Sequence, residues 1–528
     1  MLKKILAFVL VFSTLTVGAS NVRAAYTPQF SVWDGSVDTS WAEENTLIID
    51  SAADLAGLRN LVWSGTNFKS KAIYLKANID LNNLNWKYGI GGQKDNSWGS
   101  GTTRSFQGEL FGNGHIIKNL TINPNLPDAS ESPLSDEVIG KNISVGLFGY
   151  IASGTLGGLN LEDASITLPD KTPDPTSDWQ QQKNYNAGTL IGLSADNIIN
   201  GCTVKNVKFS GGWNCANEAT PMYVHIGGMI GNMAQGVNIY NSYVNGADFR
   251  EIKKGDVNYR AFKAGFACAS QNTGAVQNVY AVNMKYDKDA VISDGSWYDD
   301  GKGTSYKVMR NYDSLIMFRE GNGSYYTFGS KASVYTDKYA HARETSVISG
   351  AADPQTAEEF GADSVFVKPE HSGISYNTMI NLKEFGIEYP VTAAEKLFAV
   401  KADFYQGDTL LKELPAQGDT AEVKLRTYNT TGSAQSFDVI VGKYAAGTLT
   451  DTEIARSISA SELISGQTPG RWDQWQPYAY GVTDEELSKM NAPEPAGCAI
   501  TAGGFDSANI LCWSTVEQMT PVSRKSGI

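Results

Sequence analysis

Short apolar segments that contain glycine recur along the middle of the chain. Val145–Gly149 (VGLFG) is followed by Gly188–Gly192 (GTLIG), Gly227–Gly231 (GGMIG) and, more weakly, Ala264–Cys268 (AGFAC). Glycine costs about 1 kcal/mol relative to alanine inside a helix, and it is depleted in ordinary strands as well. The glycines therefore indicate a backbone requirement that returns in every copy.

A second unit with alternating apolar residues accompanies each glycine segment. Its Asn or Gly falls at positions 119, 158, 201, 241 and 278, so the units return every 37 to 43 residues. A steady period with variable polar sequence between the units is typical of a solenoid. One unit cannot bury its apolar side alone, whereas stacked copies with strands about 4.8 Å apart can. Glycine inside a strand permits a bend or a close backbone approach, which a narrow coil needs at the same place in every turn. A β-sandwich with coincidental glycines is the alternative.

The repeats resemble the GLUG-type repeats of bacterial surface proteins. The resemblance covers about Tyr26 to Met284, and more weakly extends to Tyr389. The preceding sequence, from VWDGSVDTSW (32–41) to FQGELFGNGHIIKNLTI (106–122), is similar to what usually precedes such repeats. The resemblance implies a right-handed parallel β-helix, and it leaves the activity open.

A helix is predicted ahead of the repeats. Ser51 followed by Asp54 is a helix-start signal, and the next apolar residues lie on one helical face. These residues are Leu55, Leu58, Leu61 and Val62. Such a helix is expected to cover the open end of the solenoid, where bare strand edges would invite aggregation.

The pattern changes near residue 397. The segment AEVKLRTYN (421–429) alternates apolar and charged residues, as a half-buried antiparallel strand does. Residues 25–392 are therefore predicted to form the β-helix with its N-terminal cap, and residues 397–528 a β-sandwich. Its ending, with Trp513, Met519 and Pro521, resembles modules that close many secreted proteins of Gram-positive bacteria, which implies an accessory or binding unit.

The first 24 residues read as a secretory signal peptide, because two lysines precede an apolar run and a small-residue cleavage site ends at Ala24. Its removal takes away three basic residues and changes the net charge from −13 to −16. A chain this acidic is not expected to bind nucleic acid. We expect a secreted, extracellular monomer, free or associated with a cell surface, without a membrane span after signal removal.

Five cysteines in 528 residues do not make a disulfide scaffold. Two bridges are conceivable, Cys202–Cys215 and Cys498–Cys512. The other interpretation is that all five, including Cys268, are small buried side chains.

The sequence supplies no catalytic motif. HExxH, CxxC, P-loop and G-x-S-x-G patterns are all missing, so no catalytic residue and no required cofactor are assigned. An acidic segment after the repeats is a candidate calcium site, although a solvated acidic loop is the simpler and favoured interpretation. Its residues are Asp287, Asp289, Asp294, Asp299 and Asp300.

Aromatic side chains in the polar segments between repeats are candidates for stacking against sugar rings, because loops on one flank of a rigid scaffold commonly carry recognition. They are Trp179, Trp213, Trp297 and Tyr298. We therefore expect an extracellular, non-enzymatic binding or adhesion protein whose partner is a glycan or a surface protein. The alternative is a polysaccharide lyase or glycoside hydrolase that works in a groove of the coil.

Overall fold

The computed structural model describes most of two regions of the chain. The described residues are 28–93, 104–131, 134, 143–169, 184–212, 222–252, 259–269, 276–283, 285, 297–299, 305–307, 316–318, 334–336, 370–371, 374–462, 480–513 and 526–527. The predicted signal peptide lies outside them. Contacts divide the chain into two compact units. The first contains residues 29–367 and 468–480, and the second contains residues 368–467 and 481–528.

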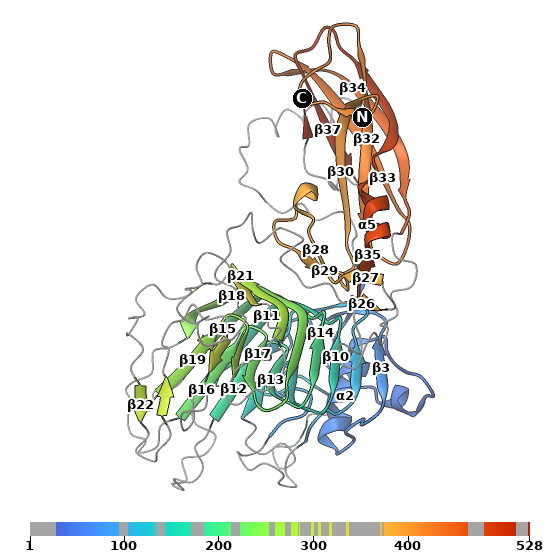
Figure 1. Cartoon of the computed structure of the whole chain (residues 1–528). Coiled ribbons are helices and arrows are strands. Elements are labelled where there is room, and N and C mark those ends of the chain that lie inside the picture. Colours follow the sequence, from blue (N-terminus) through green and yellow to red (C-terminus); the bar gives the residue numbers. More distant parts are fainter. Residues whose placement is uncertain are drawn as a thin grey trace. The chain divides into compact units, whose positions relative to one another are not determined.

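The first unit is a parallel β-helix (Figure 1). Within the described residues its largest sheet has 14 strands, and the neighbours pair in parallel with one another. These strands are β1 (Phe30–Val32), β2 (Leu47–Ile49), β3 (Ala72–Leu75), β4 (Asn78–Asp80), β5 (Glu109–Phe111), β6 (Ile116–Lys118), β7 (Thr121–Ile122), β10 (Thr155–Gly157), β11 (Asn160–Leu168), β14 (Ile198–Asn200), β15 (Thr203–Gly211), β18 (Asn238–Ile252), β21 (Val276–Val282) and β25 (Val334–Thr336).

Two smaller parallel sheets close the coil. One contains β8 (Ser144–Val145), β12 (Asn184–Gly188), β16 (Met222–Gly227) and β19 (Tyr259–Ala264). The other contains β9 (Phe148–Ala152), β13 (Ile191–Ala195), β17 (Ile230–Met233), β20 (Ala267–Ala269) and β24 (Ile316–Phe318).

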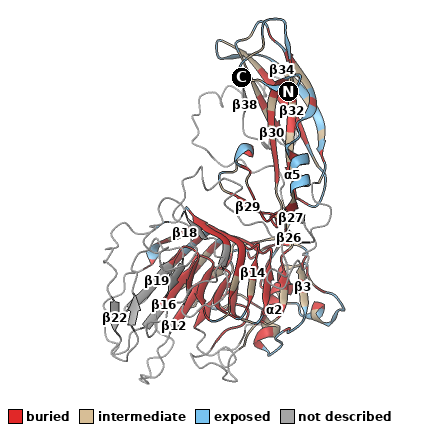
Figure 2. Cartoon of the chain, viewed as in Figure 1, coloured by how far each residue is buried: buried red, intermediate tan, exposed pale blue. Residues whose placement is uncertain are grey.

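The glycine segments found in the sequence lie one above another. Leu147 donates its backbone N–H to Thr189, Leu190 donates to Met229, and Met229 donates to Phe266. The side chains of Leu147, Leu190, Met229 and Phe266 are all buried in one continuous core, which Figure 2 shows as red strands through the coils. The predicted stack of β-helix turns is confirmed.

Close backbone approach explains the glycines of these segments. A Cβ atom on Gly192 would lie 2.5 Å from the backbone nitrogen of Val145, and one on Gly231 would lie 2.6 Å from that of Ala187. Rigid backbone cannot yield to such an overlap. Successive turns therefore approach each other so closely at these positions that only glycine fits.

Two columns of left-handed residues bend the large sheet. Gly158, Gly201, Asn241 and Asn278 form the first column, and Asn119, Asp163, Asn206, Gly246 and Asn283 form the second. The sequence pattern grouped position 119 with position 158, but the register places Asn119 beside Asp163, one column further along the strand. The grouping failed because both columns use Asn and Gly and lie only a few residues apart.

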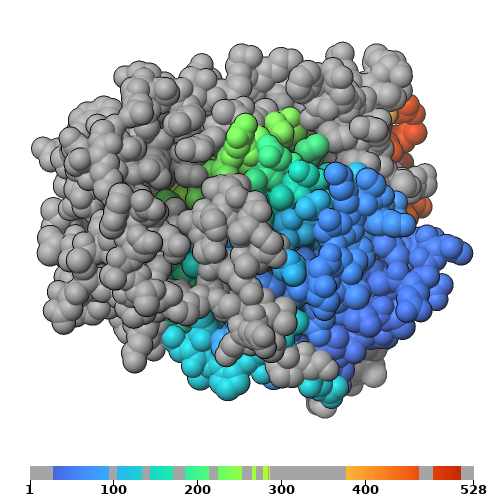
Figure 3. Space-filling view, turned by 90° about the horizontal axis from the view of Figure 1, so that it is seen from below, coloured from blue at the N-terminus to red at the C-terminus, as the bar shows by residue number. Residues whose placement is uncertain are grey.

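The predicted N-terminal helix is α2 (Ala52–Trp63). The Ser51 side chain accepts from the backbone of Asp54, and the Asp54 carboxylate accepts in return from the backbone of Ser51. Leu55 and Leu58 are fully buried in the solenoid core. The helix and a short 3-10 turn, η1 (Ser40–Glu43), therefore belong to the N-terminal end of the stack, which is blue in Figures 1 and 3.

The second unit is an antiparallel β-sandwich, as predicted. One sheet contains β30 (Phe398–Gln406), β31 (Thr409–Leu410), β32 (Thr420–Asn429) and β36 (Glu494–Thr501). The other contains β33 (Gln435–Ala445), β34 (Thr448–Ala460), β37 (Ser507–Trp513) and β38 (Ser526–Gly527). Their inner faces share one core, which includes Phe404, Val423, Val441 and Ile510.

Smaller elements complete the second unit. They are β26 (Glu370–His371), β27 (Ile374–Asn377), β28 (Met379–Ile380), η4 (Lys383–Phe385), β29 (Val391–Thr392), β35 (Val482–Thr483) and α5 (Asp484–Asn491). Residues 374–392, which the sequence analysis placed with the solenoid, make their contacts in this unit. Glu384 in η4, for example, accepts from the side chains of Lys401 and Arg426 at 3.1 and 2.6 Å.

Four of the described residues are cysteines that form no disulfide: Cys202, Cys268, Cys498 and Cys512. The conceivable Cys498–Cys512 bridge is therefore wrong, and Cys215 lies outside the described residues. Burial raises the pKa of the Cys202 and Cys268 thiols to about 12, so both stay protonated at neutral pH. Their role is to fill space in the core.

Candidate functional site

The long strands of the coil end together at one edge. Leu168, Gly211 and Ile252 are register partners at the ends of β11, β15 and β18. The strands that follow, β12, β16 and β19, also begin side by side. The strand residues on either side of segments 170–183, 213–221 and 253–258 therefore lie at equivalent places in successive coils. We call this the loop-bearing edge.

Polar side chains cover the outer surface beside the loop-bearing edge. The hydroxyls of Thr167 and Ser210 lie 3.3 Å apart, and Lys208 pairs with Glu251 at 2.6 Å. On the inner side, Phe209 and Phe249 stack with centroids 5.1 Å apart and ring planes 11° apart. The aromatic stack fixes the strand ends from within, while the solvent side stays hydrophilic.

A ladder of charges crosses the same sheet face. Asp80, Lys118, Glu162, Lys205 and Asn245 are consecutive register partners on β4, β6, β11, β15 and β18. Lys118 lies 3.3 Å from Asp80, and Lys205 lies 3.7 Å from Glu162. Charge alternates along the stacking direction, so every ionised group has an opposite neighbour. We call this row the charge ladder.

An amide group of the neighbouring left-handed column reinforces the charge ladder, since Asn119 donates to Asp80 at 2.7 Å. Within that column, Asn206 donates to Asp163 at 3.2 Å. Burial alone would raise the pKa of Asp80, but hydrogen bonds from Asn119 and Asn82 and the charge of Lys118 outweigh it and lower the pKa. The carboxylate therefore stays ionised and occupied by partners of this chain, which leaves it unsuited to acid–base catalysis at neutral pH.

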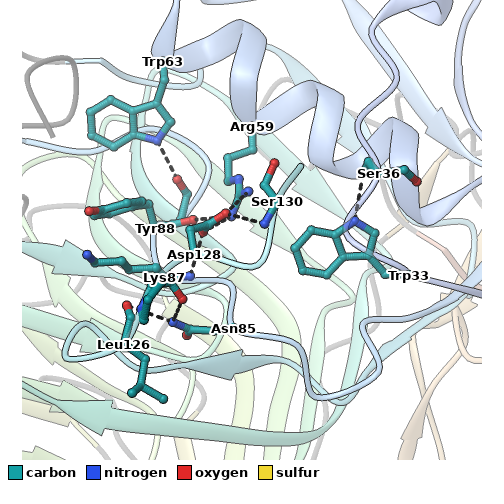
Figure 4. A network of polar contacts seen from close by, with 12 residues as sticks. Trp33, Ser36, Arg59, Trp63, Asn85, Lys87, Tyr88, Leu126, Asp128 and Ser130 are labelled. Carbon is teal, nitrogen blue, oxygen red and sulfur yellow. Dashed lines mark hydrogen bonds and ion pairs between the residues drawn. The ribbon is translucent and has the colours of Figure 1, made fainter. Parts of the chain in front are cut away.

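A buried polar network lies at the N-terminal end of the solenoid (Figure 4). The guanidinium of Arg59 pairs with Asp128 and stacks at 4.1 Å over the ring of Trp86. The backbone N–H groups of Lys87 and Ser130 also donate to Asp128. Every carboxylate oxygen of Asp128 is thus used inside the fold, so this network holds the cap in place and offers no open site.

The predicted binding residues fall largely outside the described part of the chain. Trp179 and Trp213 belong to the connecting segments and are not described themselves, although the strands on either side of them are. Trp297 and Tyr298 lie in β22 (Trp297–Asp299), whose backbone pairs antiparallel with β23 (Ser305–Lys307). Their proposed role stays a prediction.

The predicted calcium site is likewise untested. Asp287, Asp289, Asp294 and Asp300 lie outside the described residues, and Asp299 is described only as part of β22. Within the described ranges, no group of three or more His, Cys, Asp or Glu side chains is placed to hold a metal ion.

The sequence analysis missed the charge ladder, although a signal for it exists. Lys118-Asn119, Glu162-Asp163 and Lys205-Asn206 are each a charged residue followed by Asn or Asp, and they recur at the coil period. The pair marks an outward-facing residue followed by a left-handed bend. Aligning the repeats on their polar positions as well as on their glycines would have found it.

Comparison with known proteins gives one partial similarity. The chain is 29% identical to Halomucin of Haloquadratum walsbyi over 230 residues, which is 40% of this chain and 2% of Halomucin. No protein-family model and no solved structure matches the chain. None of the described helices has the length and apolar character that crossing a bilayer requires.

Proposed function

We propose that this chain is an extracellular, non-enzymatic binding protein of the GLUG-repeat type that recognises glycans or another surface through the loop-bearing edge. The observation that carries the proposal is the register of Leu168, Gly211 and Ile252, which anchors successive connecting segments one coil apart. Strand spacing of about 4.8 Å places the residues from which these segments continue in a regular row. Two of the three carry a tryptophan, Trp179 and Trp213.

The rigidity of the coil supports binding over an extended ligand. The strand ends are already held in register by the hydrogen bonds of the sheet, so their spacing does not have to be organised on binding. Aromatic rings among polar side chains suit sugar rings, which have apolar faces and hydroxyl edges. The signal peptide predicted at residues 1–24 supports a location outside the cell, which is part of the proposed function.

The alternative is a polysaccharide lyase or hydrolase. Such an enzyme needs two carboxylates that converge on one bond, or a basic residue beside bound calcium. On the described sheet face, Asp80 and Glu162 are each paired with a lysine of the ladder. This pairing favours binding over cleavage.

The experiment measures binding and product formation on the same panel of glycans. We expect immobilised polysaccharides to retain the protein, and we expect Trp179→Ala and Trp213→Ala each to weaken retention at least tenfold. Tyr444→Ala, on a partly exposed tyrosine of the second unit, is the matched control and should bind normally. New reducing or unsaturated ends would support the enzyme instead, and retention unaffected by both tryptophan substitutions would exclude the loop-bearing edge.

A further inference from the structure

A row of outward-facing side chains crosses the coil just before the first left-handed column. The register places Tyr74, Phe111, Gly157, Asn200 and Tyr240 side by side. The rings of Tyr74 and Phe111 stack with centroids 5.6 Å apart. Gly157 is the member of this row that has no side chain, which leaves a gap before Asn200. The ring of Phe111 reaches this gap from one side, with Cδ1 3.0 Å from where a Cβ atom on Gly157 would lie.

Tyr480 fills this gap from more than 300 residues away in sequence. A Cβ atom on Gly158 would lie 2.8 Å from Cε2 and from Cζ of Tyr480, and one on Gly157 would lie 3.7 Å from Cε2. Tyr480 is 4% exposed, and its contacts group it with the solenoid. Two strand spacings, about 9.6 Å, separate Phe111 from Asn200, which accommodates one ring at ordinary aromatic distances.

The left-handed backbone alone does not explain glycine at position 158. Asn241 and Asn278 adopt the same left-handed bend in later coils, with φ of 50° and 55° against 59° at Gly158. Asparagine tolerates this conformation, so the bend could be made with a side chain present. What excludes a side chain at position 158 is the ring of Tyr480.

We propose that Gly157 and Gly158 form a socket for one aromatic ring, and that Tyr480 of the same chain is its occupant. Insertion of this ring fastens the chain at Tyr480 to the outer face of the solenoid. The socket belongs to one coil among those described, because the register partners Phe111, Asn200 and Tyr240 all carry side chains at the position of Gly157.

Hydrogen exchange of the full chain, followed by mass spectrometry, tests the socket. The backbone N–H groups of Gly112, Gly114 and Gly158 donate across this bend, to Gly157, Gly158 and Asn200. Tyr480→Ala uncovers them, so their exchange should accelerate at least tenfold. Tyr480→Phe keeps the ring and should exchange as the wild type does. Unchanged protection in the alanine variant would overturn the proposal.

A second variant blocks the socket from the other side. Gly158→Asn keeps the left-handed bend but places a Cβ where the ring sits, so it should accelerate the same amides as Tyr480→Ala does. In the double variant the clash has no partner, and exchange should be no faster than in Tyr480→Ala alone. Additive effects of the two substitutions would show that Gly158 and Tyr480 act independently, which contradicts the socket.

Discussion

Arg59 and Asp128, 69 residues apart in sequence, form a bidentate ion pair inside the N-terminal cap. The distances are 3.0 Å from Nη1 to Oδ2 and 2.9 Å from Nη2 to Oδ1, and the two side chains are 0% and 3% exposed. The pair joins helix α2 to the segment that follows β7. Because a buried charge without a partner is very costly, this contact fixes how the cap closes the first coil.

Asp128→Asn should destabilise the solenoid by about 3–5 kcal/mol, because it leaves the guanidinium of Arg59 buried without a counter-charge. Urea unfolding monitored by tryptophan fluorescence measures the change. Glu44→Gln, on an exposed glutamate of the same unit, is the matched control and should change stability by less than about 0.5 kcal/mol. A loss no larger than that of the control would mean that the ion pair does not hold the cap.

Gly192→Ala should prevent the coil from stacking, because its Cβ would overlap the backbone nitrogen of Val145 at 2.5 Å. We expect little folded, protease-resistant protein. Gly442→Ala is the matched control, since its Cβ would meet only the side-chain ends of Leu449 and Tyr444, which can move. Normal thermal stability of the Gly192 variant would contradict the close approach of the two backbones.

Exchanging the charges of Glu162 and Lys205 should not be neutral, although it preserves that ion pair. Glu162→Lys places a second cation beside Lys118, the register partner on the other side. Like charges on adjacent strands cost about 0.2–1 kcal/mol, and salt should reduce the difference. Thermal melts of the exchange variant at low and high salt measure it. Equal melting temperatures of the exchange variant and the wild type at low salt would show that neighbouring ion pairs of the charge ladder do not influence each other.

The sandwich should lose stability in acid through Glu384. The ammonium of Lys401, followed by the guanidinium of Arg426, lowers the pKa of this carboxyl below its usual 4.5. A lowered folded-state pKa contributes stability that is complete above the unfolded value and disappears as the pH falls through the folded value. Glu384→Gln should therefore flatten the decline in stability below about pH 4.5, a range set by the usual carboxyl pKa. Acid titrations of both proteins that run parallel would refute this role.

The local sequence was enough to predict the repeated coils and the start of helix α2. Period and glycine placement predicted a stack of coils because each apolar strand lacks a partner until another copy covers it. Ser51 and Asp54 predicted the beginning of α2, since a capping box depends only on residues three apart. The alternation in residues 421–429 predicted β32 from an equally local signal, because the side chains of a strand with one buried face alternate every two residues.

Contacts between residues remote in sequence could not be predicted in this way. The sequence pattern aligned Asn119 with the wrong column, because Asn and Gly serve both left-handed bends equally well. It also assigned residues 374–392 to the solenoid, since no local signal shows that Glu384 binds Lys401 and Arg426. The aromatic residues proposed to bind glycans remain predictions from their composition and their place between strands.

The sequence by itself determined which segments repeat and where glycine is required. Both features can be recognised within a single repeat, because the lack of a side chain at glycine and the need of a strand for hydrogen-bonding partners are local properties. The tertiary structure alone decided that lysines and carboxylates alternate along the charge ladder, that Arg59 meets Asp128, and that Tyr480 occupies the space over Gly158. Each of these depends on the register between coils or on a contact across hundreds of residues. Register is set by the packing of the whole stack, so it cannot be read from any single turn.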